Sequence, residues 1–323
     1  MTTILLTRPT PGRYDIPGAE VVAGPDDGFR DPAKLRAFVE GARPVHAMVT
    51  MFHDRVDAAL LEAAGPDLKV VCNFAVGYDN IDVAACRARG VTVCNTPDAV
   101  TEGTADLAWA LLLGAARRLH EVGKYTRSPE YPARGVLGMS DFLGQDLAGR
   151  TLLIVGAGRI GYATALRSIG WGMKVLYVAR TRHFDFEFAP LNGRRVELDE
   201  GLREADFVSL HVPLTKETRH LIDARRLGLM KERAILVNTA RGPVVDEGAL
   251  VEALRTKKIW AAGLDVYEKE PELAPGLAEL DNAVLTPHIG SGAGRYRELM
   301  AEIVAGNIRA VLEGRTPANE VTA

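Results

Sequence analysis

The chain has 323 residues, of which 47% are hydrophobic and 25% are charged, proportions typical of a globular protein with two domains. A formal net charge of −3 leaves no basic excess, so composition argues against a nucleic-acid partner. No apolar run approaches the roughly 18 residues of a membrane span, and the N-terminal segment resembles a strand more than a signal peptide, so we expect a cytoplasmic protein with no membrane partner. The three cysteines form no CxxC pair and are expected to be buried hydrophobes, with no metal site: Cys72, Cys86 and Cys94.

The first hundred residues alternate short apolar strands with amphipathic helices, which predicts a parallel sheet buried on both faces. The expected strands are Thr3–Leu6, Ala47–Thr50, Lys69–Asn73 and Val91–Cys94. Helices are expected over Asp54–Ala64 and Asp82–Arg89, with Asp82 as an N-cap residue.

A long apolar helix is expected over Thr101–Val122, followed by an irregular loop over Tyr125–Gln145 that is rich in proline and glycine. A second strand–helix series then predicts a doubly wound sheet of six strands. They are expected at Thr151–Val155, Lys174–Val178, Phe207–Val212, Ala234–Asn238, Ala261–Val266 and Ala283–Pro287. The last helix, Gly294–Glu313, is expected to return to the first domain, which gives a substrate-binding domain of residues 1–98 and 292–323 and a dinucleotide-binding domain of residues 99–291.

A glycine-rich turn, GAGRIG, joins the strand at Thr151–Val155 to a helix expected at Tyr162–Ile169. In a strand–turn–helix unit of this kind Gly156 makes the tight turn, Gly158 lets the backbone approach a pyrophosphate, and Gly161 allows close helix packing. The N–H groups at the helix start, near Arg159 and Ile160, favour phosphate. The turn therefore predicts a bound dinucleotide.

The next strand lacks the acidic residue that takes the ribose 2′-hydroxyl of NAD, because Ala179 or Arg180 stands at its place. Arg180, Thr181 and Arg182 would form an anion site suited to a 2′-phosphate, unless the arginines only solvate the strand end. We therefore expect NADPH as the preferred cofactor, with NAD as the second.

Three later segments carry polar groups after apolar strands: NTARGPVVDE with Arg241, GLDVYEKEP with Glu270, and TPHIGS with His288. Histidine is the commonest general acid or base, but six others exist in the chain. His211, within an apolar strand, is expected to be structural.

With the loop NFAVGYDNID and the segment HVPLTKET, these motifs resemble the D-2-hydroxyacid dehydrogenase family, and within it the glyoxylate/hydroxypyruvate reductase branch. The resemblance covers almost the whole chain and implies a flavodoxin-like substrate-binding domain beside a Rossmann dinucleotide-binding domain. It implies that Arg241 binds the substrate carboxylate, that His288 donates a proton to the C2 oxygen, and that Glu270 orients the imidazole and raises its pKa.

The resemblance also assigns binding residues and an assembly. Val76, Gly77 and Ser291 would bind the substrate, together with Arg241 and His288. The residues that it adds to the cofactor site are Thr104, Val212, Pro213, Thr218, Thr239, Ala240, Asp265 and Gly290. A homodimer is implied. The loop Tyr131–Phe142 lacks the tryptophan that this branch often carries, so Leu137, Met139 or Phe142 is expected to line the pocket instead.

Two other functions stay open. The chain could be another member of the family, of the 2-ketogluconate, D-lactate or phosphite type. It could also be a nicotinamide-sensing, corepressor-like binding protein, which the presence of Arg241, Glu270 and His288 argues against.

Overall fold

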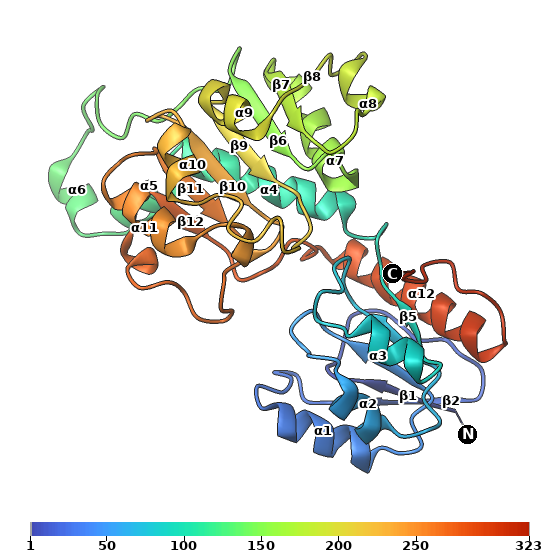
Figure 1. The fold of residues 1–323 in the computed structure, drawn as a ribbon. Coiled ribbons are helices and arrows are strands. Elements are labelled where there is room, and N and C mark those ends of the chain that lie inside the picture. Colours follow the sequence, from blue (N-terminus) through green and yellow to red (C-terminus); the bar gives the residue numbers. More distant parts are fainter. Residues whose placement is uncertain (1, 323) are drawn as a thin grey trace. The chain divides into compact units, whose positions relative to one another are not determined.

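The computed structural model describes residues 2–322, which form two compact units. Unit 1 contains the residues up to Thr101 together with those from Ser291 onward, and unit 2 is Glu102–Gly290. Each unit is built on a parallel sheet with helices on both faces, which confirms the predicted fold class (Figure 1). Across residues 2–322, no helix is both long and apolar enough to cross a membrane.

The sheet of unit 1 has five parallel strands in the order β2-β1-β3-β4-β5, the order of the flavodoxin-like fold. Its strands are β1 (Thr2–Leu6), β2 (Ala19–Ala23), β3 (Ala47–Thr50), β4 (Val70–Asn73) and β5 (Thr92–Cys94). Its helices are α1 (Pro32–Gly41), α2 (Ala58–Ala64), α3 (Val83–Ala88) and α12 (Gly294–Leu312). The last helix therefore returns to the first sheet, as predicted.

Aspartates fix where helices α1 to α3 begin. Asp82 accepts a hydrogen bond from Ala85 N at 2.9 Å, which confirms it as the N-cap of α3. The prediction that a helix begins at Asp54 was wrong, because Asp57 is the N-cap of α2 and accepts a hydrogen bond from Leu60 N. A side-chain acceptor for the first free amides sets these boundaries more sharply than hydrophobic spacing does.

Alternate residues of each strand in unit 1 pack on opposite faces of the sheet. Leu5, Met48 and Val71 contact helices α1 to α3, whereas Ile4 and Val49 contact α12. The three cysteines are all buried without disulfides, in agreement with their expected role as small hydrophobes. Burial raises the pKa of the Cys86 thiol to about 11.

The sheet of unit 2 has seven parallel strands in the order β12-β11-β10-β9-β6-β7-β8. They are β6 (Thr151–Val155), β7 (Lys174–Val178), β8 (Arg194–Arg195), β9 (Phe207–Leu210), β10 (Ile235–Asn238), β11 (Ala261–Leu264) and β12 (Ala283–Leu285). Its helices are α4 (Thr101–Ala116), α5 (Leu119–Thr126), α6 (Glu130–Arg134), α7 (Arg159–Arg167), α8 (Phe184–Glu187), α9 (Leu198–Glu204), α10 (Ala224–Leu229) and α11 (Glu247–Arg255), with short 3-10 turns η1 (Ser168–Trp171), η2 (Gly242–Val244) and η3 (Leu277–Glu279).

Two predictions about the segment after Thr101 were wrong. The long helix is broken, because α4 ends at Ala116 and Arg118 adopts the left-handed conformation before α5 begins. The expected loop after Tyr125 contains the short helix α6, in which Pro132 lies in the first turn, where proline is tolerated.

Strand β6 lies at the centre of unit 2, between β7 and β9. The chain runs outward from β6 to β7 and β8 on one side, and then from β9 to β12 on the other. In such a sheet, ligands bind at the carboxyl ends of the strands, where the order reverses. The glycine turn follows β6, and the segments that carry Arg241, Glu270 and His288 follow β10, β11 and β12 at this same edge.

Candidate active site

The glycine turn after β6 has no room for side chains at two of its three glycines. Gly156 has a φ of +104°, and a Cβ added there would lie 2.7 Å from the carbonyl oxygen of His211. A Cβ on Gly161 would lie 2.1 Å from Gly156 O. A Cβ on Gly158, in contrast, would meet nothing within 4 Å. Gly156 and Gly161 thus pack tightly against neighbouring backbone, whereas the space beside Gly158 is open. A pyrophosphate bound by the backbone of the turn requires such a space.

Helix α7 begins at Arg159, directly after Gly158, and not at Tyr162 as predicted. Arg159, Ile160 and Gly161 therefore form its first turn, where the backbone amides point out of the end of the helix. These amides and the helix dipole favour an anion beside the open space at Gly158.

At the end of β7, Arg182 of the predicted anion site is paired with an acid of the same chain. Its guanidinium pairs with Glu187 of α8, with Nε 3.1 Å and 3.0 Å from the two carboxylate oxygens. Tyr177 Oη donates to the same carboxylate at 2.7 Å. Hydrogen bonds from Arg182 and Tyr177 lower the pKa of Glu187 to about 2, so this acid is ionised at neutral pH. Arg182 therefore already has a counter-ion within the chain.

Arg195, which the sequence interpretation did not single out, supports the strand end from β8. Its guanidinium donates to Ala179 O at 2.8 Å and to Arg180 O at 3.0 Å. Arg180 itself is exposed, and its charge contributes to the lowered pKa of Glu217. The sequence pattern did not indicate Arg195, because β8 has only two residues and both are exposed arginines.

Three of the predicted cofactor residues lie close together, and a fourth has a buried hydroxyl without a hydrogen bond in the described part of the chain. A Cβ on Gly290 would lie 3.3 Å from Thr104 Oγ1 and 3.4 Å from Asp265 Oδ2, so these three residues converge. Thr239 Oγ1 is buried and has no hydrogen-bond partner among residues 2–322. Buried hydroxyls are normally satisfied, so Thr239 fits a site that a bound group completes.

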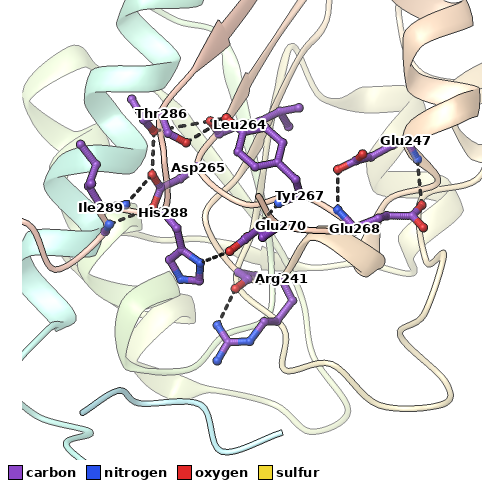
Figure 2. A network of polar contacts seen from close by, with 12 residues as sticks. Arg241, Glu247, Leu264, Asp265, Tyr267, Glu268, Glu270, Thr286, His288 and Ile289 are labelled. Atoms are coloured by element: carbon purple, nitrogen blue, oxygen red, sulfur yellow. Dashed lines mark hydrogen bonds and ion pairs between the residues drawn. The ribbon is translucent and has the colours of Figure 1, made fainter. Parts of the chain in front are cut away.

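Asp265 is a buried acid that organises the loop after β12. Its carboxylate accepts hydrogen bonds from Thr286 Oγ1 at 2.7 Å, and from Ile289 N and Gly290 N at 2.8 Å each (Figure 2). Burial raises the pKa of Asp265 and outweighs the lowering by these donors. Asp265 thus holds the side chain of Thr286 before His288 and the backbone directly after it.

The catalytic trio, by which we mean Arg241, Glu270 and His288, lies within unit 2 (Figure 2). His288 Nδ1 lies 2.8 Å from Glu270 Oε2, and both side chains are about one-fifth to one-quarter exposed, at 20% and 24%. Glu270 Oε1 accepts a hydrogen bond from Tyr267 N at 3.0 Å. Burial raises the pKa of Glu270, but His288, Tyr267 N–H and Arg241 together bring it below its ordinary value. The acid is therefore ionised beside the imidazole.

Arg241 has an extended backbone, with φ −146° and ψ 139°, and its side chain donates to Ala240 O at 2.8 Å. The amide of Asn238 donates to Arg241 O at 2.9 Å, and Asn238 Oδ1 accepts from Ala240 N at 3.0 Å. The end of β10 thereby holds the residue in place, and its positive charge reaches Glu270.

The remaining predicted residues belong to other segments of the chain. Val76, Gly77 and Ser291 belong to unit 1, so their assignment to the substrate stays a prediction. Val212 N lies near Gly156, at 2.9 Å from its added Cβ, whereas Thr218 Oγ1 donates to Pro213 O and serves its own loop.

His211 is held in the neutral form, because burial lowers its pKa to about 3. Its Nε2 lies 2.8 Å from Ser209 Oγ, in agreement with a structural role. Among residues 2–322, no group of three or more His, Cys, Asp or Glu side chains is arranged to hold a metal ion.

A doubly wound sheet with a fitting glycine turn, and a His–Glu pair with an arginine at the same edge, define a nicotinamide-dependent oxidoreductase. Residues 109–290, more than half of the chain, match the family described as D-isomer specific 2-hydroxyacid dehydrogenase, NAD binding domain. The chain belongs to the D-isomer specific 2-hydroxyacid dehydrogenases and is an NAD(P)-dependent enzyme of that family. The family resemblance stated from the sequence is confirmed.

Two relatives and one solved structure are similar to this chain over most of its length. The chain is 54% identical to the glyoxylate reductase of Thermococcus onnurineus over 280 residues, 86% of this chain and 83% of that protein. It is 51% identical to the glyoxylate reductase of Pyrococcus horikoshii over 276 residues, 85% of this chain and 82% of that protein. An NADPH-dependent glyoxylate/hydroxypyruvate reductase of Sinorhizobium meliloti, solved with NADP and malonate, superposes with a TM-score of 0.83 at 32% identity, covering 99% of this chain and 97% of that one.

Proposed function

We propose that the enzyme reduces small 2-keto acids, glyoxylate and hydroxypyruvate, to the corresponding 2-hydroxy acids, with NADPH as the preferred cofactor. The observation that carries the proposal is the 2.8 Å contact between His288 Nδ1 and an ionised Glu270 at the carboxyl edge of the sheet. The relatives named glyoxylate reductase, at 54% and 51% identity, support the choice of substrate.

In this proposal His288 is the general acid. Glu270 contacts Nδ1, and Nε2 would be the nitrogen that donates a proton to the C2 oxygen of the keto acid. The negative charge of Glu270 stabilises the imidazolium form, and Asp265 fixes the backbone that carries the ring. The nicotinamide supplies the hydride when it is bound.

Arg241 would bind the carboxylate and the C2 oxygen through its planar guanidinium. A second charge-assisted contact would come from the backbone amides near Val76 and Gly77, and Ser291 would complete the substrate contacts. A 2-keto acid has a carboxylate and a neighbouring carbonyl, and this set of donors matches both.

The glycine turn and α7 would hold the pyrophosphate, and Thr104, Thr239, Asp265 and Gly290 would surround the nicotinamide. The preference for NADPH would rest on Arg180 and Thr181, with Arg182 shared with Glu187. The absence of an acid at Ala179 removes the residue that would repel a 2′-phosphate.

We also propose a homodimer. The segment after α6 exposes apolar side chains to an unusual degree, with Val136 at 98% and Met139 at 95%. Apolar groups of this exposure favour burial against a second copy. Sedimentation that shows only monomer would contradict the dimer.

The experiment that tests the proposed function is a panel of glyoxylate, hydroxypyruvate, pyruvate and 2-ketogluconate, each with NADPH and NADH, followed by loss of reduced-nicotinamide absorbance. The proposal expects the highest kcat/KM with glyoxylate or hydroxypyruvate and NADPH. Turnover confined to 2-ketogluconate or pyruvate would contradict the substrate, and equal kcat/KM with both cofactors would contradict the preference.

A further inference from the structure

Glu247 is a buried acid outside the catalytic trio, and it binds the loop that carries Glu270. It is the first residue of α11 and is 5% exposed. Its Oε1 accepts a hydrogen bond from Glu268 N at 2.6 Å, while Glu268 Oε1 accepts one from Glu247 N at 3.1 Å (Figure 2). Each glutamate thus binds the backbone amide of the other, and we call this pair of hydrogen bonds the Glu247–Glu268 clamp.

The clamp adjoins the amide that orients Glu270. Tyr267 N donates to Glu270 Oε1 at 3.0 Å, and the next amide along the chain, Glu268 N, donates to Glu247. Two successive amides therefore bind two carboxylates, one in the catalytic trio and one in the clamp. Any displacement of Glu268 N also displaces the peptide that holds Glu270.

A glycine brings the Arg241 segment against the same peptide. A Cβ on Gly242 would lie 1.9 Å from the carbonyl of Tyr267 and 2.4 Å from Glu268 N, so the two backbones are in direct contact there. Gly242 follows Arg241 in the chain, and five residues later the chain reaches Glu247. The clamp therefore fastens the segment of Arg241 to the loop of Glu270.

Helix capping and packing do not account for a glutamate at this position. Asp246 already caps α11 by accepting a hydrogen bond from Ala249 N at 2.9 Å. Burying a carboxylate costs free energy, and burial raises the pKa of Glu247. Packing alone would favour an apolar residue, so the hydrogen bond that the Glu247 carboxylate accepts from Glu268 N is what the glutamate adds. The other hydrogen bond comes from the backbone amide of Glu247 and does not depend on its side chain.

We propose that Glu247 is a positioning residue that acts, through Glu268 and Glu270, on the protonation and placement of His288. The proposal rests on the proposed role of His288 and Glu270. The charged or titratable groups around these acids are Asp265, Tyr267, Arg241 and His288, together with His220, whose Nε2 lies 3.0 Å from Glu268 Oε1.

The test is a double-mutant cycle of Glu247→Ala and Glu270→Gln in the full chain, with Asp246→Ala as the matched control. Asp246→Ala removes the N-cap hydrogen bond of the same helix and leaves both hydrogen bonds of the Glu247–Glu268 clamp in place. Each variant is assayed for glyoxylate reduction from pH 5 to 9 and for NADPH binding by fluorescence.

Glu247→Ala should lower kcat about 10- to 100-fold, because a small misplacement of a catalytic group is costly, and should leave NADPH binding within about twofold. It should move the pH profile of kcat in the direction that Glu270→Gln moves it. In the Glu270→Gln background it should have almost no further effect on kcat. Glu247→Gln, which keeps the acceptor oxygen, should restore most of the activity.

The proposal is overturned if Glu247→Ala lowers kcat by the same factor in both backgrounds, or if Asp246→Ala reproduces the shift of the pH profile. If the alanine variant does not fold, Glu247→Asp keeps the charge, withdraws the carboxylate from Glu268 N, and should show the same non-additivity. A Glu270→Gln variant with unchanged kcat and pH profile would contradict the proposed function itself.

Discussion

His288 Nδ1 lies 2.8 Å from Glu270 Oε2, although 17 residues separate the two in the chain. The contact follows from the sheet, because β11 and β12 are adjacent parallel strands, with Leu264 paired to Leu285. The loops that follow them leave the same edge side by side, and one loop carries the acid while the other carries the imidazole. Asp265 then fixes the second loop through Ile289 N and Gly290 N.

Replacing Glu270 with glutamine should lower kcat for reduction about tenfold or more and move the descending limb of the pH profile to lower pH. The pKa of Glu270 is lowered, so its negative charge is present at neutral pH and is lost only as pH falls through that lowered value. Without that charge, the positive form of a neighbouring imidazole is less stable. The exposed Glu272 in the same loop offers the control, Glu272→Gln. A pH profile that does not move would argue against the pairing.

Replacing Arg180 with alanine should lower kcat/KM with NADPH about 10- to 100-fold, the effect of losing a charged hydrogen bond, and should leave NADH almost unchanged. Arg182→Ala should have a smaller effect, because Glu187 already binds that guanidinium. Binding of NADP and NAD by calorimetry checks both variants without turnover. An equal fall of kcat/KM with NADPH and with NADH would show that Arg180 does not bind the 2′-phosphate.

Replacing Glu187 with glutamine should raise the preference for NADPH by about two- to fivefold, since the pair with the largely exposed Arg182 is worth little in water. The change removes a negative charge beside Arg182 and keeps an acceptor for Tyr177 Oη. The ratio of kcat/KM for the two cofactors is the measurement. A fall in that ratio would instead mean that Glu187 holds Arg182 in the orientation that binds phosphate.

Two alanine substitutions in the glycine turn should separate folding from binding. Gly161→Ala places a Cβ 2.1 Å from Gly156 O and should lower the free energy of unfolding by about 1–3 kcal/mol. Gly158→Ala meets nothing within 4 Å and should leave stability unchanged, while weakening NADPH binding through the space that it fills. Thermal melts and fluorescence titrations measure the two effects. Tight NADPH binding by Gly158→Ala would place the pyrophosphate elsewhere.

The buried strands could be predicted from the sequence, because both faces of each sheet are covered and the strands are almost wholly apolar. The edge strands β2 and β8 could not. The side chains of β2 are mostly exposed, and β8 is a pair of exposed arginines, so neither has a hydrophobic pattern to detect. Helix α1 was also missed, although Asp31 caps it and Pro32 begins it.

The motifs taken together, through the family resemblance, predicted the trio but not the residues that hold it. Glu187, Arg195 and Glu268 act through contacts with backbone or with side chains on other elements, and their positions depend on the fold. The sequence motif around Arg241 includes Glu247, yet only the packing of Gly242 on Tyr267 shows which loop this glutamate binds.

The most direct test of the central claim is glyoxylate reduction with NADPH that carries deuterium at the transferable C4 position, for the wild type and for His288→Gln. Mass spectrometry of the product should show one deuterium at C2 of glycolate per turnover. His288→Gln should lower kcat by about 10²- to 10⁴-fold while NADPH binding is retained. Glycolate without deuterium, or a His288→Gln variant with wild-type kcat, would contradict hydride transfer assisted by His288.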